Sequence, residues 1–175
     1  MNPDQKQQVR VHIRWMIRRN MPEVLAIEAE SFEFPWMEED FIHCLRGRNT
    51  VGMVAEHDDR IVGFMIYRLF KRKVELLNLA VARKQRRLSI GTQMMEKLKG
   101  RLSVQRRTSI VLRVQERNLR AQFFFRGMGF RASSVEKNYW DTGDDAYLMV
   151  HRLPQSVVDN DSESCSCRGE DAAHF

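Results

Sequence analysis

The stretch at residues 74–82 is rich in Val and Leu and contains a single charged residue, Glu75. It is too short to form a helix of its own, so it predicts a buried strand. A cationic segment at residues 83–87 follows it, and from Gly91 onward apolar residues recur at helical spacing. The pattern therefore predicts a strand, a short basic loop and a helix in direct succession at the centre of the fold.

Alternating and periodic patterns predict the remaining elements on both sides of this centre. Asn20 is suited to cap the first helix, and Gly129 is suited to end the last one. The predicted order is strand, helix, helix, three strands, helix, strand, helix and two strands. The predicted strands, besides the central one, are residues 9–16, 50–57, 60–70, 108–116, 130–140 and 145–153, and the other predicted helices are residues 21–32, 37–46 and 118–128.

The length of 175 residues and the hydrophobic content of 43% suit one globular domain. We place this domain at residues 1–153 and expect residues 154–175, rich in Ser, Asp and Glu, to form a disordered acidic tail. No apolar run reaches the roughly 18 residues of a membrane span, and the polar first segment does not resemble a signal peptide. Cys44, Cys165 and Cys167 lack the spacing of a metal site. We therefore expect a cytoplasmic protein with no metal and no membrane partner.

The net charge of +6 is unevenly distributed along the chain. Residues 154–175 hold one Arg and five acidic residues, so the remainder carries +10. A basic body of this kind can bind polyanions such as coenzyme A, acidic peptides or ribosomal RNA, although many of its arginines can equally form a solvated surface. An RNA-associated protein is one alternative, for which RNA affinity would fall steeply with salt.

A strand that enters a helix through a short basic loop can bind phosphate. The first turn of the helix presents unpaired backbone N–H groups and the positive end of the helix dipole at one point. An ordinary strand-to-helix connection with solvated arginines would leave the same pattern. The segment at residues 86–91, Arg-Arg-Leu-Ser-Ile-Gly, resembles the pyrophosphate loop of the GNAT superfamily of N-acetyltransferases, and residues 79–81, Leu-Ala-Val, resemble the strand end that precedes it. Ser89 replaces the first glycine of that loop. If the position needs a positive φ, serine costs about 1 kcal/mol, which its hydroxyl could offset by capping the helix or binding phosphate.

Three further motifs resemble the ribosomal-protein alanine N-acetyltransferase (RimI) family within that superfamily. The segment at residues 27–36 contains Ile-Glu-Ala-Glu-Ser-Phe followed by Pro-Trp, which in the family forms the floor of the peptide site. Residues 118–130 resemble its Asn-x-x-Ala helix with the closing Gly-Phe, and Asp145-Ala146 opens the last strand.

The resemblance implies an α/β (α+β) GNAT fold, a mixed seven-stranded sheet splayed at its centre with four helices, and acetyl-CoA as the cofactor. The implied cofactor-binding residues are Leu79, Ala80, Val81, Arg86, Arg87, Leu88, Ser89, Ile90, Gly91, Thr92 and Asn118. The implied acceptor-site residues are Glu28, Phe32, Trp36 and Tyr139. For Asn118 a helix N-cap is the alternative role, for Glu28 a surface position and for Tyr139 an ordinary place in the sheet.

The catalytic acid and base of the family are not retained. The base is a Glu on the fifth strand, where this chain has Arg113, and the acid is a Tyr, where this chain has Phe125. Arginine is not deprotonated in proteins, and phenylalanine has no proton to give. Neither role transfers to this chain.

Glu75 and Tyr139 are the candidate replacements for the catalytic pair. Glu75 matches the place of the general base in histone-type members of the superfamily, and burial would raise its pKa. Its alternative role is a cross-strand ion pair with Arg113 or Lys73. Tyr139, predicted to lie in the strand at residues 130–140, is the candidate proton donor or peptide-binding hydroxyl.

The pKa of the acceptor amine favours one substrate class. An α-amine has a pKa near 8 and a lysine near 10.4, so much more of the α-amine is neutral at pH 7. A site without its usual base therefore loses less on an α-amine, since a general base contributes about 10²–10⁴-fold. We predict an Nα-acetyltransferase for a protein N-terminus, such as that of a small ribosomal subunit protein. The alternatives are a catalytically impaired acyl-CoA-binding module and an enzyme for lysine or a small amine.

Overall fold

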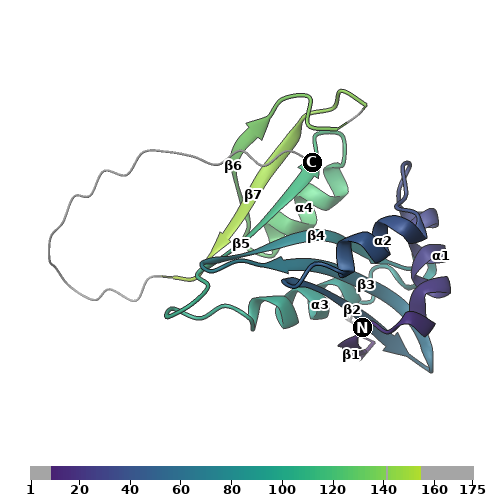
Figure 1. Ribbon diagram of the computed structural model, residues 1–175. Helices are drawn as coiled ribbons and strands as arrows, with labels where there is room; N and C mark the ends of the chain where they lie inside the picture. The colour runs from purple at the N-terminus through teal and green to yellow at the C-terminus, as the bar shows by residue number, and fades with distance from the viewer. Residues whose placement is uncertain (1–8, 141, 155–175) are drawn as a thin grey trace, which may run out of the picture.

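The computed structural model describes residues 9–140 and 142–154 (Figure 1). The predicted order of elements is confirmed: seven strands form one mixed sheet in the order β1-β2-β3-β4-β5-β7-β6, with four α-helices around it. The strands are β1 (His12–Trp15), β2 (Thr50–His57), β3 (Arg60–Leu69), β4 (Lys73–Val81), β5 (Ser109–Gln115), β6 (Arg131–Glu136) and β7 (Ala146–Arg152), and the helices are α1 (Met21–Ser31), α2 (Glu38–Leu45), α3 (Ile90–Lys99) and α4 (Leu119–Gly127).

The centre of the sheet is splayed, as predicted. β4 and β5 are its parallel pair, and they remain in register from Lys73 opposite Ser109 to Leu76 opposite Leu112. Beyond that point the pairing stops. In Figure 1, β5 and its neighbours β7 and β6 swing away from the layer formed by β1 to β4. The result is a V-shaped opening whose vertex lies at the end of the β4–β5 pairing.

A bulge in β4 lies at the level where the two strands separate. Asn78 pairs with Ile66 and Leu76 pairs with Tyr67, so Leu77 is an extra residue with no partner on β3. A bulge bends its strand and increases the local twist. As a result Leu77 and Asn78 both face the side of α1.

Each face of the sheet is covered by two helices. One apolar cluster contains Met94 of α3 and Phe125 of α4, and the other contains Val24 of α1 and Phe41 of α2. On β4, the residues before and after the bulge that face α3 are Val74, Leu76, Leu79 and Val81. The residues on the opposite face therefore point toward α1 and α2, and this is the face on which the charged and polar groups of β4 are found.

The first predicted strand is shorter than expected. Residues 9–11 do not pair with β2, because the backbone of Val9 bonds to Leu88 O (3.3 Å) and to the side chain of Gln93 (2.6 Å). Asn20 does not cap α1 through its side chain. Its Oδ1 instead accepts hydrogen bonds from Ile17 N–H (3.1 Å) and the Arg14 guanidinium (2.9 Å).

The predicted strand at residues 130–140 is also shorter, because β6 ends at Glu136. Asn138 has a positive φ of 48°, and its N–H donates to the Asp145 carboxylate at 3.0 Å, so the chain turns there. Tyr139 consequently lies in the loop after β6 and not in the strand. The predicted tail was residues 154–175, of which residues 155–175 lie outside the described residues.

Candidate active site

The loop that precedes α3 contains two residues in the left-handed conformation. One of them is Ser89, the position for which the sequence raised the question of a positive φ. Arg87 has a φ of 69° and Ser89 a φ of 62°. Ser89 therefore occupies a position that favours glycine, and its hydroxyl does not cap the helix. The loop directs the chain into α3 so that the first-turn N–H groups are directed at its N-terminal end, which is the arrangement that binds phosphate.

Gly91 lies where α3 approaches α4 and the end of β4 closely. A Cβ at this position would lie 3.3 Å from Phe124 Cζ of α4 and 3.7 Å from Val81 Cγ2 at the end of β4. A side chain longer than methyl would enter the gap between these two residues. The absence of a side chain thus allows the N-terminus of α3 to lie beside the end of β4.

The two loop arginines have different surroundings. The Arg86 guanidinium donates to Val81 O and to Ser31 Oγ, both at 2.9 Å, so it ties the loop to β4 and α1. Arg87 is exposed. Between these side chains and the helix, Leu88 packs against the core and Ile90 is buried. Arg86 is thus fixed in place by two hydrogen bonds, while the backbone N–H groups of the loop, Arg86 and Arg87 stay the predicted pyrophosphate-binding groups.

The strand end predicted to hold the acetyl and pantetheine groups lies past the bulge. Leu79, Ala80 and Val81 pair with β3, while their other edge lies beyond the last residue that pairs with β5. Asn118 Oδ1 accepts the N–H of Ala121 at 3.1 Å, which confirms its alternative role as the N-cap of α4. Thr92 lies in the first turn of α3.

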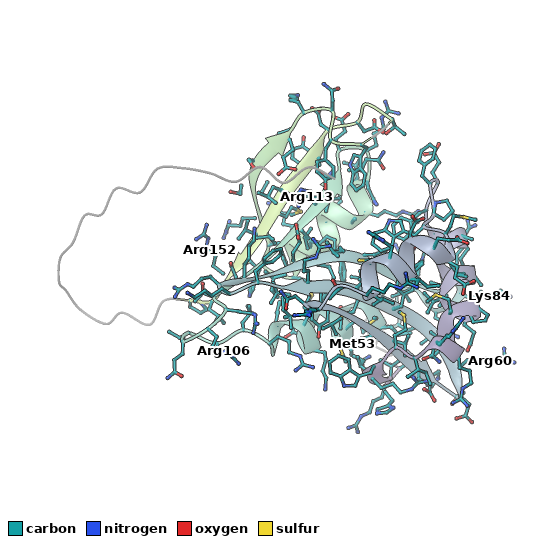
Figure 2. All side chains as sticks on the ribbon, viewed as in Figure 1. Met53, Arg60, Lys84, Arg106, Arg113 and Arg152 are labelled. Carbon is teal, nitrogen blue, oxygen red and sulfur yellow. The ribbon has the colours of Figure 1, made fainter. Side chains whose placement is uncertain are left out.

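Arg113 occupies the vertex of the opening, one residue beyond the end of the β4–β5 pairing. Its guanidinium donates to Glu75 Oε1 on β4 at 2.6 Å and to the two oxygens of Glu136 on β6 at 2.7 and 3.2 Å. Its Cζ lies 5.0 Å from the centre of the Tyr139 ring, which is in edge contact with Trp140. Figure 2 shows Arg113 projecting where the two halves of the sheet diverge.

The two candidate catalytic residues are thus joined through Arg113. The hydrogen bonds that Arg113 donates to Glu136, ahead of the one that it donates to Glu75, raise the pKa of Arg113 above its ordinary value, so it carries a permanent positive charge. The three charged groups sum to −1. The structure supports the alternative role of Glu75, the cross-strand ion pair. Phe125, at the position of the family's acid, lies in the core in edge contact with Phe130, so it has no access to a leaving group.

The opposite wall contains the predicted acceptor-site residues of α1 and the segment after it. Glu28 is buried, which corrects its alternative role as a surface residue. Its carboxylate accepts the N–H of Trp36 (2.9 Å) and bonds to the side-chain amide of Asn78 on β4. Burial raises the pKa of Glu28 more than these hydrogen bonds lower it. Trp36 stacks edge-on against Phe41, and Phe32 packs against the same apolar cluster.

Asn78 and Glu136 are two site residues that sequence reasoning missed. Asn78 interrupts an otherwise apolar strand, and this polar interruption was a usable signal. Glu136, at the end of β6, meets Arg113 only through the order of strands β5-β7-β6 in the sheet, which has no local pattern in the sequence. In the described ranges, no three His, Cys, Asp or Glu side chains are grouped to hold a metal ion. None of the helices described is long and apolar enough to span a membrane.

Comparisons with known proteins agree with this geometry. Residues 18–130 match the sequence profile of the acetyltransferase (GNAT) family. The chain is 27% identical over 141 residues to the ribosomal protein bS18-alanine N-acetyltransferase of Salmonella typhimurium, which covers 79% of this chain and 93% of that one. The crystal structure of the ribosomal-protein-S18-alanine N-acetyltransferase from Escherichia coli superimposes with a TM-score of 0.76 at 21% identity, covering 87% of this chain and 100% of the other. Arabidopsis thaliana NAA60 in complex with acetyl-CoA gives 0.72 at 17% identity, covering 82% and 100%. Both levels of the predicted resemblance are therefore confirmed.

Proposed function

Because the chain belongs to the acetyltransferase (GNAT) family, we propose that it transfers the acetyl group of acetyl-CoA to the α-amine of a protein N-terminus. The observation that carries the proposal is the opening between β4 and β5 beside the N-terminus of α3. The helix end can bind an anion, and the edge of β4 beyond Leu76 does not pair with β5. The similarity to ribosomal-protein alanine N-acetyltransferases makes an Ala-first N-terminus the first acceptor to test.

The cofactor end of the opening consists mainly of backbone groups. The N–H groups from Leu88 to Thr92, in the loop and the first turn of α3, would hold the pyrophosphate together with the exposed Arg87. The free edge of residues 79–81 would bind the pantetheine amides as an added strand does. Acetyl-CoA supplies an activated acetyl thioester, and the protein orients it and keeps water away.

The acceptor end has features that suit a protein N-terminus. The two segments beside the opening carry aromatic side chains, Trp36 after α1 and Tyr139 with Trp140 after β6. These can bind the first side chains of a peptide, while the net charge of −1 around Arg113 attracts a cationic amine. An α-amine is also the acceptor that depends least on a strong base, because its pKa is near 8. A ribosomal substrate would imply a cytoplasmic enzyme.

A second function has specific support in Arg113 and Phe125. Because the family's acid and base are absent from their usual places, the chain could bind acetyl-CoA and regulate a partner without turnover. Acetylation of lysine or of a small amine is the remaining alternative within the same chemistry.

Incubation of the purified protein with acetyl-CoA and a peptide panel distinguishes these functions. The panel contains three acceptors. They are an Ala-first peptide, the same peptide with a blocked N-terminus and one internal Lys, and a small-molecule amine. Mass spectrometry should locate acetylation on the free N-terminus only. Acetyl-CoA binding by calorimetry without acetylation of any acceptor would favour the regulatory module. Mass spectrometry of protein N-termini from cells with and without the gene then identifies the natural acceptor.

A further inference from the structure

Two polar side chains meet inside the protein, behind the wall of the acceptor end. Glu28 of α1 is 1% exposed, and Asn78 of β4 is 8% exposed. Asn78 Nδ2 donates to Glu28 Oε1 at 3.2 Å and to Oε2 at 3.1 Å, while Trp36 N–H donates to Oε1 at 2.9 Å. One buried carboxylate therefore joins α1, the central strand and the segment that carries Trp36.

The position of Asn78 places this pair at the opening. Asn78 follows the bulge and lies two residues beyond Leu76, the last residue of β4 that pairs with β5. Because Nδ2 faces Glu28, the amide oxygen Oδ1 points away from it. Within the ranges described, this buried oxygen has no hydrogen-bond donor. A buried acceptor without a donor is unfavourable, and it indicates a position where a ligand N–H or O–H can bind.

Glu28 differs from the other carboxylates around the opening in its partners. Glu75 and Glu136 are both bound by the Arg113 guanidinium, which competes with any amine for their oxygens. Glu28 is bound by two neutral donors, the N–H of Trp36 and the amide of Asn78. Of these three groups it is the one that can take up a proton without breaking an ion pair.

We propose that the Glu28–Asn78 pair receives the acceptor amine and its proton: Asn78 Oδ1 accepts an N–H of the amine, and one bridging water passes the proton of the ammonium to the Glu28 carboxylate. The inference rests on the proposed function, because it needs an amine acceptor. In this step the ammonium loses one proton and becomes an amine with a free lone pair, while the carboxylate becomes a carboxylic acid. Glu28 thus replaces the base that the position of Arg113 cannot supply.

The surroundings of Glu28 suit this role. Burial raises its pKa, which brings it closer to that of an α-amine. Three ionisable groups on neighbouring elements have other partners. Glu75 binds Arg113, Glu30 accepts the N–H of Arg83 at 2.6 Å, and Arg68 lies beside Cys44.

Asn78 also provides a way to release the amine after proton uptake. A protonated Glu28 is a donor, so the Asn78 amide can turn and accept from the new O–H. Oδ1 then no longer binds the substrate nitrogen. The orientation of one amide is thereby coupled to the protonation state of one carboxyl group.

Rate measurements with Glu28→Gln on an Ala-first peptide test the proposal. Gln keeps an oxygen for Trp36 N–H but cannot take the proton. We expect the rate at pH 7 to fall about 10²-fold, and the loss to shrink as the pH approaches 9, where the amine arrives neutral. The matched control is Glu23→Gln in the same helix, whose carboxylate accepts Ile61 N–H at 3.0 Å away from the opening. It should follow the wild-type profile.

Two measurements without acetyl-CoA give an independent answer. In the folded protein the raised pKa of Glu28 means that stability is lost as the pH rises from the ordinary range of a glutamate through the raised value. The melting temperature of the wild type should therefore fall relative to Glu28→Gln over this range. If Glu28→Gln does not fold, a carboxyl ¹³C NMR titration of the wild type replaces it. The Glu28 midpoint should lie above that of an ordinary glutamate and should shift when the Ala-first peptide is added.

The outcomes separate this inference from the proposed function. A wild type that acetylates no peptide removes the proposed function, whatever Glu28 does in the titration. A wild type that acetylates the peptide, with a Glu28→Gln profile parallel to it and a loss below about threefold, overturns the inference alone. A Glu28 midpoint at the ordinary value, or one that the peptide does not shift, also overturns it.

Discussion

The two ends of the opening between β4 and β5 are built on different principles. At the cofactor end, the groups expected to bind acetyl-CoA are mainly backbone N–H and C=O groups, held by the turn before α3 and by the free edge of β4. At the acceptor end, the groups are side chains from α1, β4, β5, β6 and the loop after β6. The first end resembles the family motif despite Ser89, whereas the second has Arg113 and Phe125 at the expected catalytic positions and contains an ion-pair cluster. Function carried by backbone tolerates a change of side chain, and function carried by side chains must be rebuilt.

Gly91→Glu should have the largest effect on this comparison. The new side chain would enter the gap between Phe124 and Val81 and bring a negative charge to a site for phosphate. We expect acetyl-CoA affinity to fall about 10²-fold, or ~2.7 kcal/mol, by calorimetry. Gly127→Glu is the control, because a Cβ there has no neighbour within 4 Å. A folded Gly91→Glu with unchanged affinity would place the cofactor elsewhere.

Arg113→Met should have the next largest effect, on stability. It would leave Glu75 and Glu136 without their common partner, and the Glu75 side chain is only 13% exposed. We expect a loss of about 2 kcal/mol in the free energy of unfolding by chemical denaturation. Arg117→Met removes an arginine that is 80% exposed and should cost less. Equal losses in the two variants would mean that the cluster does not stabilise the acceptor end.

Glu75→Gln separates a structural from a catalytic role for this residue. Gln still accepts a hydrogen bond from Arg113 but loses the charge, so we expect a cost of about 1 kcal/mol in stability. The acetylation rate should stay within about threefold of the wild type at each pH. A rate loss near 10²-fold at pH 7 that disappears by pH 9 would instead identify Glu75 as the base.

Ser89→Gly should have the smallest effect and should act at the cofactor end. It relieves the left-handed strain at a φ of 62° but increases the freedom of the unfolded chain, so we expect a net gain of ~0.5 kcal/mol. Ser89→Ala keeps the Cβ and should show no gain. A loss in Ser89→Ala would reveal a partner for the hydroxyl.

Sequence periodicity predicted the order of elements, because that order follows from long, regular segments. The resemblance to the GNAT motifs implied the splayed sheet, and it also identified Ser89 as the position where a positive φ would cause strain. Periodicity failed where a single hydrogen bond redirects the chain. The contact of Val9 with Gln93 shortened β1, and the bond from Asn138 N–H to Asp145 ended β6 before Tyr139.

The acceptor end was less predictable for a similar reason. Whether Glu75 would be a base or an ion-pair partner depended on the direction of the Arg113 side chain on the neighbouring strand. The sequence alone allowed both roles. Glu28 was expected on a groove or a surface, and its burial depends on Asn78, fifty positions away along the chain. Contacts between distant elements of this kind leave no local periodicity to detect.

The extra residue in β4 has a consequence for how this fold can change by insertion and deletion. Leu77 is the one residue that interrupts the regular alternation between β3 and β4 in the stretch that leads to the opening. A three-nucleotide deletion of its codon would leave Leu76 and Asn78 adjacent and on opposite faces, as in an ordinary strand. The shortened strand would have no cause to bend and could continue its ladder with β5. A smaller gene would then encode a more regular sheet with a closed centre, so the opening depends on one extra amino acid, whose side chain also packs against the apolar cluster beneath α1 and α2.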